Sequence, residues 1–546
     1  MEKNASRASW ALPLFLCLTA ACTLSAVLKY DVIWDFVNYH YYNGFAFLNG
    51  RLNYDIAPAF LNTFFNPLLD VVNYLLTEKF NTQPTVFHFI LGLPFGFVLY
   101  FLYRTARLFF DAGTLKGRVC VAAVLLIGTT GFATFFQIGS TTGEMPLAAL
   151  ILAAFFLLVR DIGFERRYSA RTFLLAGFLL GAGAGLKMTG LLYCLSTGIT
   201  LLLFVRRFER PWTLLGIFIL GGAAGFLLFN GFWMKTLWEN YGNPVFPFAN
   251  AVFKSPYFDP VNYSDQTHLA GRSFFEELLL PFALLIHVKE APAVGYADIS
   301  DIRFALGFII GLLFLFSLRR KKNRVETPTG VLFLAVWLVV SYILWLTLFS
   351  IIRYAVPIEA LLAIALVKAL ASFRRPESMI GEALYFSFLL FITGIMLLTP
   401  YQSEPWGTRR GAQYVLDAET IVPPPGTLIY QFGAPTSAFI ARTAQEQPDV
   451  RSIGFIKADD LVPLQHWDIT DRGRFREIRD ELTEKHKGPR LAFLQSDSLF
   501  FLNPPELLKG MTCRPLRRMQ NGKVSPNLLW PYTNVCFSEE LKDRLK

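Results

Sequence analysis

The sequence predicts a polytopic α-helical membrane protein that carries a soluble α/β domain at its C-terminal end. Its 546 residues are 53% hydrophobic and have a mean hydropathy of +0.41, which is too apolar for a soluble protein of this length. Apolar runs of about 20 residues recur up to residue 399, and each is long enough to cross a ~30 Å hydrocarbon core. After residue 400 charged residues become frequent and no further run of this kind occurs.

The apolar runs predict eleven membrane spans. They are 9–28, 85–103, 119–137, 144–160, 172–187, 190–205, 212–232, 302–318, 329–349, 352–371 and 379–399. Lys and Arg gather in every second loop between them, as positive-inside sorting requires, so these loops and the N-terminus are expected in the cytoplasm.

The predicted domains follow from this alternation. Residues 1–399 form a transmembrane domain with long outer loops at 29–84 and 233–300, and residues 400–546 form an extracytoplasmic α/β domain. The net charge of +10 lies in the short basic loops, whereas the C-terminal domain is nearly balanced. This distribution argues against a nucleic-acid partner.

The C-terminal domain shows short β-rich runs that alternate with helical segments. Strands are expected at 427–433, 451–456 and 490–494, with a helix from Pro435 and a charged amphipathic helix over 474–486. No glycine fingerprint for a nucleotide is present.

This domain also contains a cysteine pair, Cys513 and Cys536. In an oxidising compartment we expect a disulfide between them; the alternative is two free buried thiols.

The first outer loop contains candidates for a catalytic base, which must be a carboxylate or an imidazole within reach of a hydroxyl proton. Asp31 and Asp35 are four residues apart, so a helix would place both on one face, where their like charges would push the pKa of one of them up. Both remain candidates, and Asp35 is favoured because Trp34 and the aromatic run after it surround it. We expect His40 and Asp55 in the same loop to contact substrate.

Polar residues at the outer ends of later spans complete the candidate site. Lys187 follows a glycine-rich segment, and Arg353 lies at the outer start of the tenth span together with Tyr354, which we expect to contact substrate. Arg binds phosphate through two donors, so two cations at one level favour a phosphate ligand over snorkelling to lipid headgroups. Glu144 opens the fourth span; it either complements the helix dipole or holds a substrate hydroxyl or a metal.

Four short motifs in the same order and on the same side resemble the GT-C superfamily of polytopic glycosyltransferases, which use polyprenyl-phosphate-linked sugars. These motifs are Trp34-Asp35 with Asn38-Tyr39-His40, Gly185-Leu-Lys187-Met-Thr189, Asn243-Pro244-Val-Phe-Pro247-Phe, and Arg353-Tyr354 with Pro357.

The resemblance implies that Asp35 is the catalytic base and that Lys187 and Arg353 contact the lipid phosphate. An adjacent pair of acidic residues, common in the superfamily, is missing here, so the base stays open between Asp31 and Asp35 and no metal is indicated. We expect these acidic and basic side chains to converge in one pocket that opens toward lipid.

The predicted function is inverting transfer of a sugar from a polyprenyl-phosphate donor on the outer face of a bacterial inner membrane. The acceptor is a glycan, lipid or protein of the cell envelope, and no cofactor is expected. The alternative function is a transporter or flippase for a lipid-linked glycan. A third possibility is an assembly scaffold without enzymatic activity.

Overall fold

The structure is a computed structural model that divides into two compact units. It describes residues 2–29, 35–262, 273–285, 299–320, 328–372, 379–399, 401–402, 413–432, 436–455, 469–495, 508–520, 523–528 and 533–541. Unit 1 comprises residues 1–30, 89–229 and 265–406. Unit 2 comprises residues 31–88, 230–264 and 407–546.

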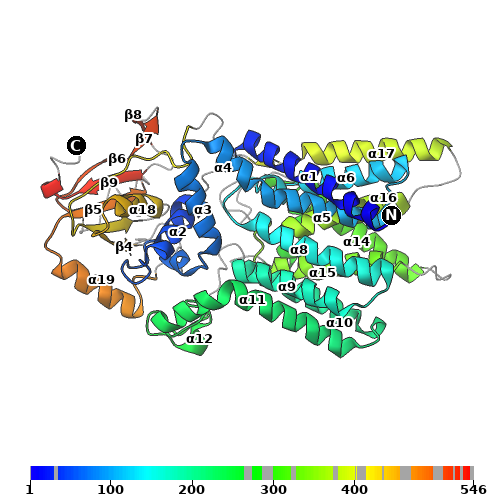
Figure 1. The fold of residues 1–546 in the computed structure, drawn as a ribbon, viewed down its shortest axis with the longest axis horizontal. Helices are drawn as coiled ribbons and strands as arrows, with labels where there is room; N and C mark the ends of the chain where they lie inside the picture. The colour runs from blue at the N-terminus through cyan, green and yellow to red at the C-terminus, as the bar shows by residue number, and fades with distance from the viewer. Residues whose placement is uncertain are drawn as a thin grey trace. The chain divides into compact units, whose positions relative to one another are not determined.

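Unit 1 is a bundle of helices, drawn in Figure 1. Its helices are α1 (Glu2–Leu28), α5 (Leu93–Phe109), α6 (Leu115–Thr129), α7 (Phe132–Phe135), α8 (Glu144–Leu158), α9 (Ala170–Leu186), α10 (Leu191–Leu203), α13 (Phe274–Ala283), α14 (Ile302–Arg320), α15 (Thr329–Leu348), α16 (Val356–Ser372) and α17 (Met379–Leu398). Helices α4 (Pro84–Leu91) and α11 (Pro211–Tyr241) each have one part in unit 1 and one in unit 2.

Each of the eleven predicted spans falls on helical residues. Within the described residues, six segments are long and apolar enough to cross a membrane. They are Trp10–Leu28, Pro84–Phe109, Glu144–Glu165, Pro211–Tyr241, Thr329–Leu348 and Gly381–Leu398. The predicted class of multi-span helical membrane protein is confirmed.

Small residues let α9 and α11 pack closely against each other in unit 1. A Cβ atom on Gly181 would lie 1.9 Å from the carbonyl oxygen of Gly222, so the two backbones approach at a distance that only glycine allows. This contact fixes the end of α9, and Lys187 is the next residue after that helix.

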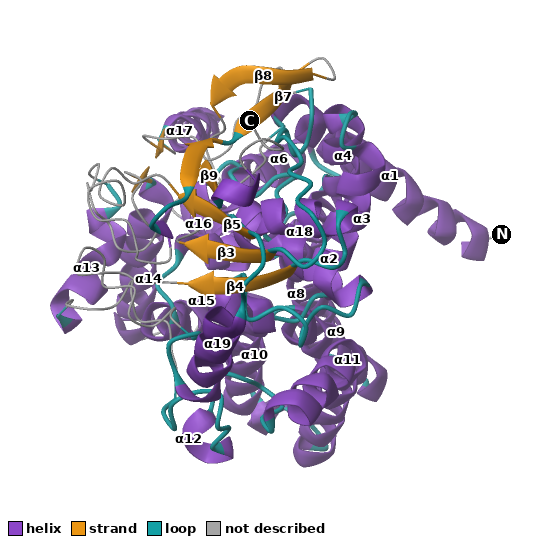
Figure 2. Cartoon of the chain, turned by 90° about the vertical axis from the view of Figure 1, so that its left-hand side faces the viewer, coloured by secondary structure: helices purple, strands orange, loops and turns teal. Residues whose placement is uncertain are grey.

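Unit 2 contains a five-stranded mixed sheet in the order β4-β3-β5-β9-β6. Figure 2 shows its strands side by side. They are β3 (Leu428–Phe432), β4 (Arg451–Phe455), β5 (Arg490–Gln495), β6 (Thr512–Pro515) and β9 (Thr533–Phe537). The first three are parallel and match the predicted strands, whereas β9 pairs antiparallel with both β5 and β6.

Two helices of unit 2 belong to the same sheet domain. Helix α18 (Ser437–Glu446) follows β3 and helix α19 (Gly473–Lys485) precedes β5, near the positions that the sequence predicts. A separate hairpin is formed by β7 (Arg517–Gln520) and β8 (Lys523–Leu528). The α/β class predicted for the C-terminal part is therefore correct, although β6 to β9 were not anticipated.

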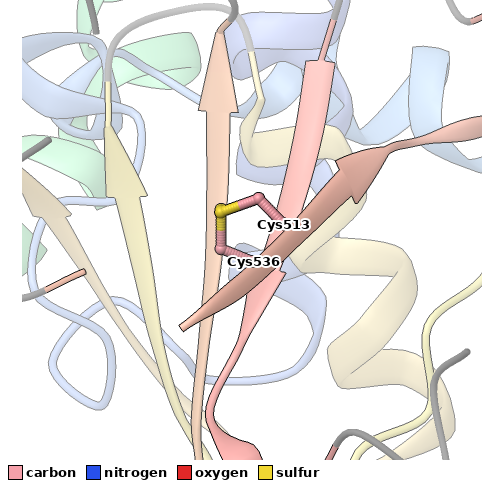
Figure 3. The surroundings of a disulfide bond; sticks show 2 residues. All are labelled: Cys513 and Cys536. Carbon is pink, nitrogen blue, oxygen red and sulfur yellow. A yellow bond between two sulfur atoms is a disulfide. The ribbon is translucent and has the colours of Figure 1, made fainter. Parts of the chain in front are cut away.

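A disulfide joins Cys513 on β6 to Cys536 on β9, as Figure 3 shows. The two residues are direct partners across the strand pair, with Cα atoms 4.0 Å apart. It closes a loop with a sequence separation of 23 residues, which limits the conformations of the unfolded chain.

Replacing both Cys513 and Cys536 by Ala is expected to lower the free energy of unfolding by about 2–4 kcal/mol, through the lost cross-link. A thermal melt of the purified protein measures this loss. Cys194→Ala, which removes a free thiol, serves as the control. An unchanged melting temperature in the double variant would contradict the stabilising role of the cross-link.

Part of the first outer loop belongs to the sheet of unit 2. The carboxylate of Asp55 accepts hydrogen bonds from Arg51 at 2.7 and 2.9 Å, from the Tyr42 hydroxyl at 2.7 Å and from the Ser452 amide at 2.8 Å. Arg51 also donates to the carbonyl oxygen of Val450 at 2.6 Å. Next to these contacts, Ile56 forms a parallel bridge to β4, so the loop extends the edge of the sheet.

Replacing Asp55 by Ala leaves the buried Arg51 guanidinium without its carboxylate, and we expect a loss of about 3–5 kcal/mol in stability. A thermal melt measures it. The matched control is Glu481→Ala, which breaks an exposed pair with Lys485 on α19 and is expected to leave the melt unchanged. Equal melting temperatures for the two variants would show that Asp55 does not stabilise the fold through Arg51.

Candidate functional site

Two basic side chains of unit 1 meet at one carboxylate. The Nζ atom of Lys187 donates to Oε1 of Glu144 at 2.5 Å and to the carbonyl oxygen of Thr142 at 2.7 Å. The Nε atom of Arg353 lies 3.7 Å from the same Oε1. The structure therefore brings together three of the residues singled out from the sequence, the first and last of which are more than 200 positions apart along the chain.

Local structure explains why Glu144 is fixed in place. It is the first residue of α8, where a negative charge complements the helix dipole, and Gly143 before it has a left-handed φ of 86°. The preceding turn is held by Gln137, whose side-chain oxygen accepts hydrogen bonds from Thr142 at 2.5 Å and Ser140 at 3.1 Å. Glu144 thus opens a helix and anchors Lys187, while its role in holding a substrate hydroxyl or a metal remains a prediction.

The two cations also share an aromatic ring. Lys187 Nζ and Arg353 Cζ each lie 5.5 Å from the centroid of Tyr354, a distance at which a ring face attracts a positive charge. Tyr354 is held in turn by Tyr193, whose hydroxyl donates to the Tyr354 carbonyl oxygen at 2.5 Å. Lys187 lies in an extended segment after α9, and Arg353 lies in the 3₁₀ turn Ile352–Ala355.

Among the three side chains of this cluster the positive charges outnumber the negative ones. Lys187 and Arg353 carry two positive charges, and Glu144 carries one negative charge, so the three together have a net charge of one positive. The Glu144 side chain is 4% exposed, whereas those of Lys187 and Arg353 are 18% and 19% exposed. Because the cations are the more accessible members, the cluster can bind an anion such as a phosphate.

A second buried charge cluster of unit 1 was not predicted from the sequence. Arg303 pairs with Asp301 at 2.9 Å, and the carboxylate of Glu359 accepts the backbone amides of Ala133 at 2.9 Å and Thr134 at 3.1 Å. These bonds cap the N-terminus of α7. An ionisable residue within an apolar run of the sequence can indicate such a cluster, because a charge in that setting usually needs a partner.

In unit 2, Asp35 directly precedes the π-helix Phe36–His40 and is 4% exposed. In this helix the amide of Tyr41 donates to the carbonyl oxygen of Phe36, five residues before it. Residues four and five apart therefore share a face, so Asp35 lies on the face of Tyr39 and His40. Asp31, the other candidate base, and Trp34 lie outside the described residues.

His40 is paired with a carboxylate that the sequence analysis missed. Its Nδ1 atom lies 2.5 Å from Oδ1 of Asp70, on α3 (Leu68–Phe80), and both side chains are buried. The pair exists because α2 (Tyr41–Leu48) packs closely on α3. A Cβ atom on Gly44 would lie 2.4 Å from the Asp70 carbonyl oxygen and 2.6 Å from Cβ of Tyr74.

The predicted site residues thus fall into three groups. Lys187, Glu144, Arg353 and Tyr354 lie together in unit 1, Asp35 and His40 lie together in unit 2, and Asp55 is occupied by contacts within the fold. The role of Asp55 as a substrate contact remains a prediction. Within the described part of the chain, no group of three or more His, Cys, Asp or Glu residues lies close enough to hold a metal.

Comparison with solved structures shows which known protein has a similar architecture. The chain is similar to ArnT from Cupriavidus metallidurans, in a crystal structure bound to undecaprenyl phosphate, with a TM-score of 0.54, 13% sequence identity, and coverage of 97% of this chain and 98% of that chain. The apo structure of the same ArnT matches with a TM-score of 0.55, at the same identity and coverage. The chain has a GT-C fold.

The GT-C fold of this chain is recognisable from structure and not from overall sequence similarity. No protein-family model matches the sequence, and no curated protein matches it significantly. At 13% identity the likeness to ArnT establishes the fold alone. One fold can support different reactions, so the chemistry of this protein depends on the side chains of its candidate site.

Proposed function

We propose that this protein is an inverting glycosyltransferase that uses a polyprenyl-phosphate-linked sugar. The acceptor is a glycan, lipid or protein of the cell envelope, and transfer takes place on the outer face of a bacterial inner membrane. The observation that carries the proposal is the cluster of Lys187, Arg353 and Glu144 in a GT-C fold. The similar ArnT structure holds undecaprenyl phosphate, which supports a lipid phosphate as the anion.

The charge of the cluster suits this donor. A polyprenyl-phosphate sugar is a phosphodiester with one negative charge, and the cluster has one positive charge in excess. When the sugar leaves, the phosphate becomes a monoester and gains further negative charge. Two cations aimed at it stabilise that growing charge, which is where electrostatic catalysis has its largest effect. Lys187 and Arg353 are assigned this role.

The reaction is a single displacement at the anomeric carbon. The acceptor oxygen forms a bond to that carbon, while the bond between the carbon and the phosphate oxygen breaks and its electron pair stays on the phosphate. Asp35 takes the proton of the acceptor hydroxyl. Because attack and departure occur on opposite sides, the anomeric configuration inverts.

The test is an assay of the purified full-length protein in liposomes with a panel of polyprenyl-phosphate sugars and a crude cell-envelope extract as acceptor. Release of free polyprenyl phosphate together with labelling of the extract is the expected result. Movement of the intact donor between leaflets without bond cleavage would instead identify a flippase. Absence of both activities with every donor would favour a scaffold.

A further inference from the structure

A buried amide cluster in unit 2 has unsatisfied hydrogen-bonding capacity. We use this name for Asn38, His40, Asn43 and Asn62. Six of their side-chain atoms have no hydrogen-bond partner among the residues that the structure describes: both polar atoms of Asn38 and of Asn62, Nε2 of His40 and Oδ1 of Asn43. Buried polar atoms are nearly always paired, so six in one place indicate that water or a ligand supplies the partners.

Two members of the cluster, His40 and Asn43, are held by Asp70. The side-chain nitrogen of Asn43 donates to the carbonyl oxygen of Asn62 at 2.9 Å and lies 3.2 Å from Oδ2 of Asp70. The other oxygen of Asp70 accepts from His40. Asn38 lies about one helical turn before Asn43, and its backbone carbonyl accepts a bond from Ser437. The framework of the cluster is therefore fixed, while six of its buried polar atoms keep unused hydrogen-bonding capacity.

Asp70 also determines which nitrogen of the His40 imidazole carries the proton. A carboxylate only accepts hydrogen bonds, so Nδ1 of His40 must carry the proton. In the neutral ring Nε2 then has a lone pair and accepts a hydrogen bond. The group that it accepts from must be a donor such as a hydroxyl.

Asn43, one of the four members of the cluster, lines a cavity of about 260 Å³. The wall includes the side chains of Thr63, Asn53, Asn240, Phe47 and Trp233. None of the described residues that line it is charged. A neutral ligand with both polar edges and an apolar face fits such a wall better than a phosphate does.

We infer that the amide cluster and this cavity form a binding site for the hydroxyl groups of a neutral sugar ring. Amides donate and accept, as hydroxyl groups do, and His40 adds an oriented acceptor. The inference rests on the proposed function for its biological meaning, because a glycosyltransferase holds a sugar on the donor and, in many cases, another on the acceptor. Asp70 is a positioning residue that acts through His40.

Two leucine substitutions test the site without breaking the framework. Asn38→Leu and Asn62→Leu remove polar side-chain atoms that have no hydrogen-bond partner in the described part of the chain, and they keep the branching and the number of heavy atoms of the side chain. We expect the melting temperature to hold or to rise, since an unpaired polar group is removed. Binding of methyl glycosides of neutral hexoses and pentoses, measured by saturation-transfer NMR, should fall about tenfold or more. Wild-type binding in both variants, or no glycoside binding to the wild type, would overturn the inference.

Asp70→Asn tests the tautomer. The new amide can accept from Asn43 with its oxygen and donate to Nδ1 of His40 with its nitrogen, so the network stays paired while the proton moves to Nε2. With ¹⁵N-labelled histidine, NMR should report the change of tautomer, and glycoside binding should fall. Asp259→Asn, a carboxylate-to-amide change at the pair with Arg472, is the matched control. An altered tautomer with unchanged glycoside binding, or a doubly protonated His40 in the wild type, would contradict the assignment.

A second probe identifies the source of the sugar. If the site holds the transferred sugar, the leucine variants should also retain less polyprenyl-phosphate hexose in native mass spectrometry. If the site holds the acceptor sugar, binding of the methyl glycosides should fall and retention of the lipid-linked hexose should not change. Either loss supports the sugar site. Cluster-dependent glycoside binding without transfer by the wild type would refute the proposed function alone. Wild-type transfer rates and glycoside binding in all variants would refute the sugar site alone.

Discussion

Asp35→Asn is expected to lower the rate of sugar transfer by about 10²–10⁴-fold, the usual contribution of a general base. The amide has almost the same shape as the carboxylate but does not take the acceptor proton. Asp35 is buried at the start of a π-helix, a type of local distortion that often marks functional sites. The measurement is the initial rate of polyprenyl phosphate release by purified protein, normalised to the amount of folded protein.

The same assay separates the two candidate bases. Asp31→Asn is compared with Asp35→Asn, and Asp259→Asn serves as the control for a carboxylate elsewhere in unit 2. A severe loss in Asp31→Asn with turnover retained in Asp35→Asn would transfer the role to Asp31. Melting temperatures near that of the wild type would show that the loss is chemical and not a failure to fold.

Arg353→Gln is expected to reduce kcat/KM for the lipid-linked donor by about 10²–10³-fold, because a charged contact to the leaving phosphate is lost. With Gln at this position the excess positive charge of the cluster disappears, since Lys187 and Glu144 then balance each other. The substitution should lower kcat itself, because the contact between Arg353 and the phosphate strengthens as negative charge develops on the phosphate.

Arg207→Gln provides a matched control for this experiment. Arg207 is also in unit 1, where it donates to the Thr329 hydroxyl at 3.0 Å, and it belongs to a loop predicted to face the cytoplasm. Its substitution should leave donor use unchanged. Equal effects of the two substitutions on kcat/KM would mean that Arg353 acts only through stability or membrane insertion.

The helical part of the fold could be predicted because its signal is local. Apolar runs of spanning length and the alternation of basic loops depend on neighbouring residues only, and the eleven expected spans fall on helices. The parallel strands β3, β4 and β5 carried a similar local signal. Strands β6 and β9 did not, because segments such as Thr512–Pro515 are short and their residue types do not alternate clearly between apolar and polar.

The site could be predicted only at the level of single residues. Lys187, Arg353 and Asp35 stand out because charge next to a membrane span is costly and therefore informative. Their partners depend on tertiary packing. Asp70 contacts His40 because Gly44 lets α2 and α3 approach each other closely. No local sequence pattern predicts a contact between residues that are 30 positions apart.

The most direct test of the account is the configuration of the product formed from a polyprenyl-phosphate sugar labelled with ¹³C at the anomeric carbon. We expect a new glycosidic bond of inverted configuration and one free polyprenyl phosphate for each sugar transferred, as NMR of the purified reaction would show. Retention of configuration, or passage of the labelled donor across the bilayer with its phosphate bond intact, would contradict it.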